Sequence, residues 1–87
     1  MSRFTVAWRH TALEELADVW TKAANRNEIT SAVGTIERKL RENPHGFAEG
    51  EVEGLYFLAE SPLRVGFTIN DASRTVTVVG LGVSRSR

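Results

Sequence analysis

Arg64 and three glutamates are the side chains of this sequence whose chemistry we consider first. Arg64 is the one charged residue in the alternating run at residues 63–69, and a guanidinium can hold a phosphate through several hydrogen bonds. Glu49, Glu51 and Glu53 precede that run. A carboxylate accepts a proton near neutral pH only where burial or neighbouring charges raise its pKa. No obvious proton donor accompanies them, because an arginine stays protonated at any working pH.

The same residues also fit roles without chemistry. Arg64 is typical of a solvated or ion-paired strand position, and a charged loop keeps the edge of a sheet soluble. His10 and His45 have no partner at the spacing of metal ligands. No glycine-rich phosphate loop and no Ser-His-Asp set can be argued from the sequence. We therefore expect no metal site and no cofactor.

Three strands must position Arg64. Residues 63–70 alternate apolar and polar side chains, which is the pattern of a half-buried strand. A short aromatic-rich run at residues 55–59 precedes it, and a β-branched run at residues 75–79 follows it. Turn compositions separate the three runs. Connections this short predict an antiparallel meander, with Arg64 pointing away from the apolar face of its strand.

The N-terminal segment predicts a strand followed by a helix. Apolar and polar residues alternate over residues 3–8, as in a strand. Thr11 and Glu14 have the spacing of a capping box, in which each side chain bonds the other's backbone amide. Apolar residues at helical spacing then predict a helix over residues 12–24.

A second helix should follow almost at once. Asn27 is a good N-cap, and an apolar stripe continues until Asn43-Pro44, where the residue before proline disfavours helical geometry. Gly34 costs this helix about 1 kcal/mol relative to alanine, so we interpret it as a mark of close contact. The short break predicts that the two helices are antiparallel neighbours. Residues 45–54 are predicted to form a loop.

The order of these elements predicts an α+β fold in a single domain, residues 1–87. A helical hairpin should pack on one face of a four-stranded, mainly antiparallel sheet and leave the other face at least partly open. Truncating Trp20 to alanine should then cost about 3–5 kcal/mol. The periodicities place these residues together in the core: Val6, Leu16, Trp20, Ile36, Leu40, Val65 and Phe67.

Composition excludes several classes of protein. The chain contains no cysteine, which suits a reducing cytosol and excludes a disulfide framework. Its longest apolar runs are too short to span a membrane, and its first residues lack a signal-peptide core. Eleven basic residues balance eleven acidic ones, so there is no global attraction for nucleic acid. These features predict a cytoplasmic protein without a membrane partner.

Three segments in this order resemble the RelE/ParE superfamily, the toxins of type II toxin-antitoxin pairs. They are residues 4–8 with the following helix that carries Leu16 and Trp20, residues 36–40 before Asn43-Pro44, and residues 62–69 before residues 76–78. The resemblance covers nearly the whole chain. It implies a β-α-α-β-β-β fold and a small cognate antitoxin that folds on binding to the helices and a sheet edge.

The resemblance implies two kinds of target. One branch of the superfamily cleaves ribosome-bound mRNA, using basic residues on the open sheet face and a C-terminal histidine or tyrosine. The other branch poisons DNA gyrase. Arg64 matches the arginine on the third strand of the nucleases, and Arg85 is the nearest substitute for the C-terminal residue. The expected basic positions before and on the second strand instead read Glu49, Glu51, Glu53, Tyr56 and Phe57.

Three hypotheses follow, and whether the protein is an enzyme stays open at this point. The first is a ribosome-dependent mRNA endoribonuclease, with Arg64 on the phosphate, one of the three glutamates as base, for which we take Glu51, and Arg85 assisting. The second is a gyrase-directed toxin that performs no chemistry. The third is a lapsed toxin that persists as a protein-binding module. The missing nuclease residues and the zero net charge favour the second and third hypotheses.

Overall fold

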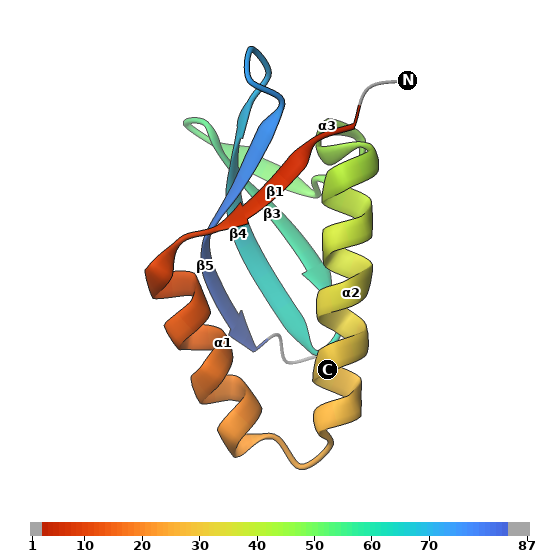
Figure 1. Cartoon of the computed structure of the whole chain (residues 1–87), viewed down its shortest axis with the longest axis vertical. Helices are drawn as coiled ribbons and strands as arrows, with labels where there is room; N and C mark the ends of the chain where they lie inside the picture. Colours follow the sequence, from red (N-terminus) through yellow and green to blue (C-terminus); the bar gives the residue numbers. More distant parts are fainter. Residues whose placement is uncertain (1–2, 84–87) are drawn as a thin grey trace.

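The structure, a computed structural model, describes residues 3–83. Figure 1 shows two long helices, α1 and α2, on one side of a twisted sheet. No helix in residues 3–83 has both the length and the apolar character needed to cross a membrane. The elements are β1 (Thr5–Trp8), α1 (His10–Lys22), α2 (Arg26–Glu42), α3 (Pro44–Phe47), β2 (Gly50–Val52), β3 (Leu55–Glu60), β4 (Leu63–Asn70) and β5 (Thr75–Val83).

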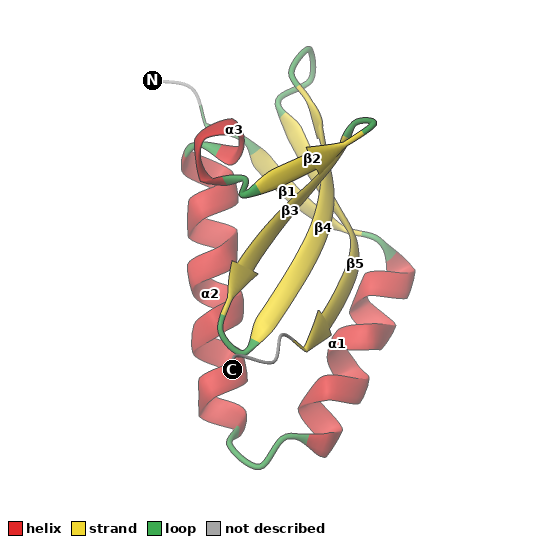
Figure 2. Cartoon of the chain, turned by 180° about the vertical axis from the view of Figure 1, so that it is seen from behind, coloured by secondary structure: helices red, strands yellow, loops and turns green. Residues whose placement is uncertain are grey.

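The sheet has five strands in the order β1-β5-β4-β3-β2. β1 pairs with β5 in parallel, and the other three pairings are antiparallel. This arrangement confirms the predicted α+β class and the mainly antiparallel sheet, with one strand more than predicted. Figure 2 shows the sheet from the side opposite to the view of Figure 1, where neither long helix covers it.

The fifth strand arises in the predicted loop at residues 45–54, which contains α3 and β2. Asn43 caps α3, because its side chain accepts a hydrogen bond of 3.0 Å from the Gly46 amide. β2 and β3 are joined by a tight turn in which Glu53 and Gly54 both have positive φ. Such turns match the twist of a hairpin. β2 is three residues long with all side chains exposed, so no hydrophobic alternation marks it.

A β-bulge divides β5 into two halves. Gly66 on β4 lies opposite Gly80, and Phe67 lies opposite Val78, so Val79 is the extra residue. An extra residue reverses which side chains face the core beyond it. Val78 before the bulge and Leu81 after it are therefore both buried.

α1 begins without the predicted capping box. Its first residue is His10, and Arg9 at the N-cap makes no side-chain capping bond. The Thr11 hydroxyl instead donates to the Val79 carbonyl at 3.5 Å, while Glu14 lies 2.9 Å from His10 one turn earlier. The prediction is wrong because tertiary contacts with β5 and a local pair within α1 occupy both side chains.

α2 also begins earlier than predicted. The Asn25 side chain caps it by accepting a bond of 3.3 Å from the Glu28 amide, so Asn27 lies inside the helix. A Cβ atom built at Gly34 would meet nothing within 4 Å. Gly34 is exposed and marks no close contact, contrary to our interpretation.

One hydrophobic core fills the space between the helices and the sheet. Ile36, Leu40, Val65 and Phe67 are buried in it, as predicted. Val6 and Leu16 are half-buried and pack against it. Trp20 is 41% exposed, so the prediction that it is a core residue is wrong.

Three part-buried side-chain contacts tie the helices to the sheet. Each spans 2.7–2.8 Å: Trp8 Nε1 donates to Glu37 Oε2, Lys39 Nζ donates to Glu60 Oε1, and the Leu81 amide donates to Glu15 Oε1. The contact of Glu15 satisfies a backbone amide on the half of β5 that lies beyond the pairing with β1. These contacts hold α1 beside β5, and hold α2 against β1 and β3.

Candidate functional site

Arg64 lies on the sheet face that is turned away from the core. In register it stands opposite Ala59 on β3 and Gly82 on β5, while the next residue along β4, Val65, is buried. Its side chain is exposed and forms no ion pair within residues 3–83. Arg64 is therefore a free cation in the described part of the chain, available to an anion from outside.

Glu51 lies on the opposite face of the sheet from Arg64. Glu51 stands opposite Tyr56, and Tyr56 stands opposite the buried Phe67. Side chains directly opposite one another on paired strands share a face, so this row faces the helical side. The Glu51 carboxylate accepts a hydrogen bond from the Gly54 amide. The structure does not bring Glu51 to Arg64.

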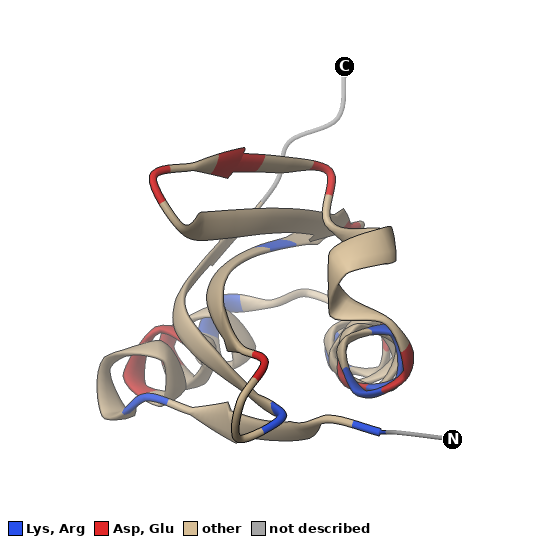
Figure 3. Ribbon diagram, turned by 90° about the horizontal axis from the view of Figure 1, so that it is seen from above, with Lys and Arg blue, Asp and Glu red and all other residues tan. Residues whose placement is uncertain are grey.

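The other candidate residues do not complete a catalytic set in the described part of the chain. Arg85 lies outside the described residues. Glu49 is exposed, and its amide donates to the Phe57 carbonyl at 2.7 Å. Glu53 occupies the tight turn after β2. Figure 3 shows acidic residues along an outer strand of the sheet and at both of its ends, and β2 is an edge strand in the strand order. Catalytic roles for Arg64, Glu51 and Arg85 stay predictions.

A histidine–aspartate pair was missed by sequence reasoning. His45 Nε2 lies 2.9 Å from Asp71 Oδ1, which joins α3 to the turn after β4. The His45 ring also meets Tyr56 edge-on, with centroids 5.7 Å apart. His45 and Asp71 are 26 residues apart, so no local pattern pairs them. Asp71 follows the last residue of β4, whereas Arg64 lies near the first. At the strand rise per residue the two are about 20 Å apart. The pair therefore cannot exchange a proton with a group bound at Arg64.

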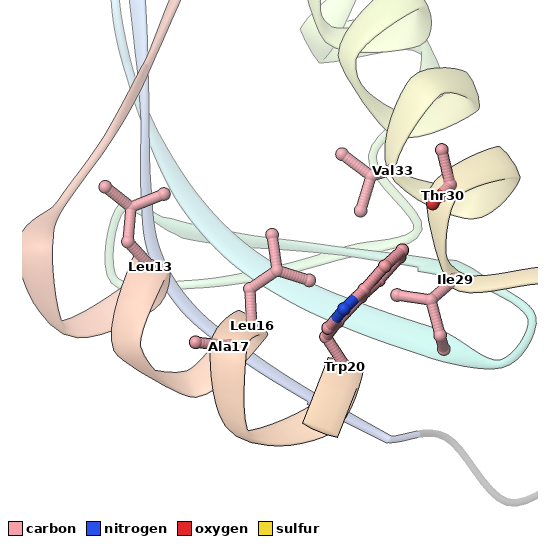
Figure 4. A pocket seen from close by; sticks show the side chains of 7 residues that line it. All are labelled: Leu13, Leu16, Ala17, Trp20, Ile29, Thr30 and Val33. Atoms are coloured by element: carbon pink, nitrogen blue, oxygen red, sulfur yellow. The ribbon is translucent and has the colours of Figure 1, made fainter. Parts of the chain in front are cut away.

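An open apolar groove lies between α1 and α2. It has a volume of about 330 Å³. Figure 4 shows its lining from both helices, with the Trp20 ring reaching from α1 toward α2. We call it the interhelical groove and define it by Leu13, Leu16, Ala17 and Trp20 of α1 and by Ile29, Thr30 and Val33 of α2.

The interhelical groove is almost wholly apolar and partly open to solvent. Leu13 is 47% exposed and Trp20 is 41% exposed. The Thr30 hydroxyl is the one side-chain polar group of its lining besides the indole N–H. Arg26 lies over the Trp20 ring with 5.8 Å to the centroid and donates to the Trp20 carbonyl at 3.0 Å. Arg26 therefore contacts the indole ring, and it is not among the residues that line the groove.

The groove exists because the sheet separates the two helices. α1 packs on β5, whereas α2 packs on β1, β3 and β4. The short connection after α1 keeps the helices close at one end, and they diverge toward the other end (Figure 1). The predicted antiparallel direction is confirmed, but the helices do not close on each other along their length.

The sequence contains a signal for this groove. The apolar residues of α1 form two adjacent rows at helical spacing, and one row is enough to contact a sheet. Ala12, Leu16 and Val19 form the row that packs on the core. Leu13, Ala17 and Trp20 form the neighbouring row and line the groove. An apolar stripe wider than one packing contact predicts a second contact surface.

Comparisons with known proteins place this architecture among toxin structures. No protein-family model and no curated protein matches the sequence. Among solved structures, a chain of the RelBE2 toxin-antitoxin complex of Mycobacterium tuberculosis is similar, with a TM-score of 0.80 and 18% identity over 99% of this chain and 97% of that one.

Two further structures show the same likeness. A chain of the chromosomal ParDE system of P. aeruginosa matches with a TM-score of 0.68 and 13% identity, over 94% of this chain and 97% of that one. The isolated E. coli RelE toxin matches with a TM-score of 0.66 and 17% identity, over 97% of this chain and 87% of that one. This chain therefore shares the fold of these three solved structures, which is the fold that the order of its segments predicted.

Proposed function

We propose that this protein is the toxin of a type II toxin-antitoxin pair and that a small antitoxin protein neutralises it by seating an amphipathic helix in the interhelical groove. The observation that carries the proposal is the exposure of Leu13 and Trp20 in an apolar groove. Contiguous apolar surface exposed on a small protein marks an interaction site. Covering it removes apolar area from water, which favours the complex.

The groove suits a helix better than an extended peptide. A helix packs on another helix at an axis distance of about 8–10 Å, and a third helix can contact the inner rows of α1 and α2 together. Apolar side chains at helical spacing on the partner would meet Leu13 and Trp20 on one side and Val33 on the other. Short polar residues at its edges would meet the Thr30 hydroxyl.

The structural neighbours support a protein partner of this kind. The M. tuberculosis structure is a toxin-antitoxin complex, and the P. aeruginosa structure is a chromosomal toxin-antitoxin system. We extend an antitoxin partner to this chain by that analogy and by its own groove.

We further propose that toxicity arises from binding a protein target rather than from cleaving mRNA. RNA cleavage through the 2′-hydroxyl needs a base and an acid close to the cation that holds the phosphate. Arg64 and Glu51 lie on opposite faces of the sheet. DNA gyrase is the protein target that the superfamily resemblance implies. A lapsed toxin with a surviving antitoxin surface is the remaining alternative.

The test of the partner is co-expression with the small open reading frame beside this gene. We expect growth arrest when the protein is expressed alone, rescue by the neighbour, and a complex that survives purification. Leu13→Asp should weaken the complex by at least about 100-fold, or about 2.7 kcal/mol, because the complex would bury an unpaired carboxylate. Val52→Asp is the matched control, since Val52 is an exposed apolar residue on β2 outside the groove.

Trp20 supplies a second readout on the same complex. An indole that passes from 41% exposure to burial shifts its fluorescence emission to shorter wavelength. A Trp8→Phe background leaves Trp20 as the single tryptophan. A purified complex whose affinity is the same for Leu13→Asp and for Val52→Asp, with unchanged Trp20 emission, would exclude the groove as the antitoxin site. The absence of both arrest and a neighbouring partner gene would favour the lapsed toxin.

A further inference from the structure

A second hollow lies on the sheet face opposite the interhelical groove. It has a volume of about 470 Å³ and runs across β3, β4 and β5. None of its lining residues lines the interhelical groove. We call it the glycine trough and define it by the residues that matter to its chemistry: Leu55, Phe57, Arg64, Gly66, Gly80 and Gly82.

The floor of the trough is bare backbone. Gly66 and Gly80 stand directly opposite each other on β4 and β5, and Gly82 stands opposite Arg64. A Cβ atom at Gly66 would meet Leu55 and Phe57 at 3.7–3.8 Å, which is ordinary contact, and one at Gly82 would meet nothing within 4 Å. Packing inside the chain therefore does not require glycine at Gly82, and the missing side chains leave room for a group from outside.

One wall of the trough is apolar and one end is cationic. Leu55 and Phe57 lean over Gly66 from β3. Arg64 is the one charged side chain in the lining, and it forms no ion pair within residues 3–83. A group that binds here would therefore combine an apolar part with a single negative charge.

One cation in the lining, and glutamates at the two ends of β2, disfavour a polyanion in the trough. Glu49 hydrogen-bonds through its amide to the carbonyl of Phe57, in the wall of the trough. Glu53 follows in the turn after β2. Nucleic acid binds through the sum of many phosphate contacts with Lys and Arg, whereas the lining of the trough offers one arginine. One carboxylate on a protein segment avoids that repulsion.

We propose that the glycine trough docks a segment of a protein partner that places an apolar side chain over Gly66 and Gly80, against Phe57, and a carboxylate on Arg64. The inference rests on the proposed function, because it assigns this surface to the protein target and the interhelical groove to the antitoxin. The hollow accommodates the apolar side chain of the partner. The guanidinium of Arg64 favours partner segments that carry a carboxylate close to that side chain.

The test selects ligands with purified protein and does not depend on toxicity. A phage-displayed library of random peptides is panned on the wild type, and enriched peptides are synthesised and titrated. We expect peptides in which Asp or Glu accompanies a large apolar residue. Gly82→Val should weaken them at least about 30-fold by filling the floor, and Arg64→Ala about tenfold.

Two matched variants control the result. Thr68→Val changes an exposed residue of β4 outside the trough and should leave affinity unchanged. Leu13→Asp alters only the interhelical groove and should also leave trough peptides bound, whereas peptides lost with Leu13→Asp bind the groove. Thermal melts should stay close to wild type for each variant. If Gly82→Val melts lower, Gly82→Ala provides the smaller filling of the same space.

Three outcomes would overturn the proposal. Enriched peptides could lack the apolar-acidic signature, or could bind Gly82→Val and Arg64→Ala as tightly as wild type. A single-stranded RNA oligonucleotide could bind the wild type and lose affinity with Arg64→Ala, which would assign the trough to RNA. Failure of the antitoxin proposal is seen separately, as equal affinity of the antitoxin for Leu13→Asp and Val52→Asp.

Discussion

Replacing Trp20 and Phe67 by alanine, one at a time, measures whether the interhelical groove is open in solution. Both are large aromatic residues at positions with helical or strand periodicity, and the sequence assigns both to the core. The structure separates them, because Phe67 is fully buried and Trp20 is 41% exposed. The two substitutions should therefore differ in their effect on the free energy of unfolding.

The magnitudes follow from burial. Phe67→Ala leaves a cavity inside the core, and such changes cost about 3–5 kcal/mol. A core indole buries about 150–250 Å², so the covered part of Trp20 corresponds to roughly 100 Å² beyond alanine, or about 2.5 kcal/mol. Alanine loses no rotamer freedom on folding, whereas tryptophan does, and this difference offsets roughly 0.5 kcal/mol of the loss in stability. We expect Trp20→Ala to cost about 2 kcal/mol, half the cost of Phe67→Ala.

Thermal unfolding followed by circular dichroism measures the difference. For a domain of this size, 1 kcal/mol shifts the melting temperature by about 4–8 °C. Trp20→Ala should melt about 8–16 °C below wild type, and Phe67→Ala should melt lower again by about 4–8 °C for each further kcal/mol that it costs. Equal losses of about 4 kcal/mol would refute the reasoning. They would mean that the indole is enclosed and that the groove is closed in the free protein.

Further predictions concern contacts at the sheet. Arg64→Ala should change the free energy of unfolding by less than about 0.5 kcal/mol and leave ribosome-programmed mRNA as intact as with wild type; clean cleavage by wild type that the variant loses would restore the nuclease hypothesis. A double-mutant cycle on Lys39 and Glu60 should give about 1 kcal/mol in urea unfolding, because the pair is 23% and 30% exposed; zero coupling would contradict it. Trp8→Phe should cost about 1–2 kcal/mol, since the Glu37 carboxylate loses a donor at 2.8 Å; a melt equal to wild type would contradict it.

The architecture could be predicted from the sequence because its signals are local. The alternation in residues 63–70 and the helical spacing of Ile36 and Leu40 depend on near neighbours in the chain. Each pattern has one face apolar enough to require burial. Four residues that these patterns placed in the core are buried: Ile36, Leu40, Val65 and Phe67. The order of the elements then leaves few ways to cover one face of a sheet.

The candidate site could not be assembled from the sequence. The alternation within one strand does not reveal which residues of another strand it pairs with. Arg64 was correctly placed on the open face by alternation alone. Glu51 lies on a strand without any alternation, and its face is decided by its register with Tyr56. The pairing of His45 with Asp71 likewise requires that α3 meet the turn after β4.

The sequence by itself determined that α1 would be amphipathic, and only the tertiary structure decided which apolar row of α1 meets the core. Two rows are available, and the position of α1 beside β5, held by the bond from the Leu81 amide to Glu15, turns one toward the sheet. The other row, with Leu13 and Trp20, is left exposed in the groove. The rotation of a helix about its axis depends on what it packs against, and that information is not local to the helix.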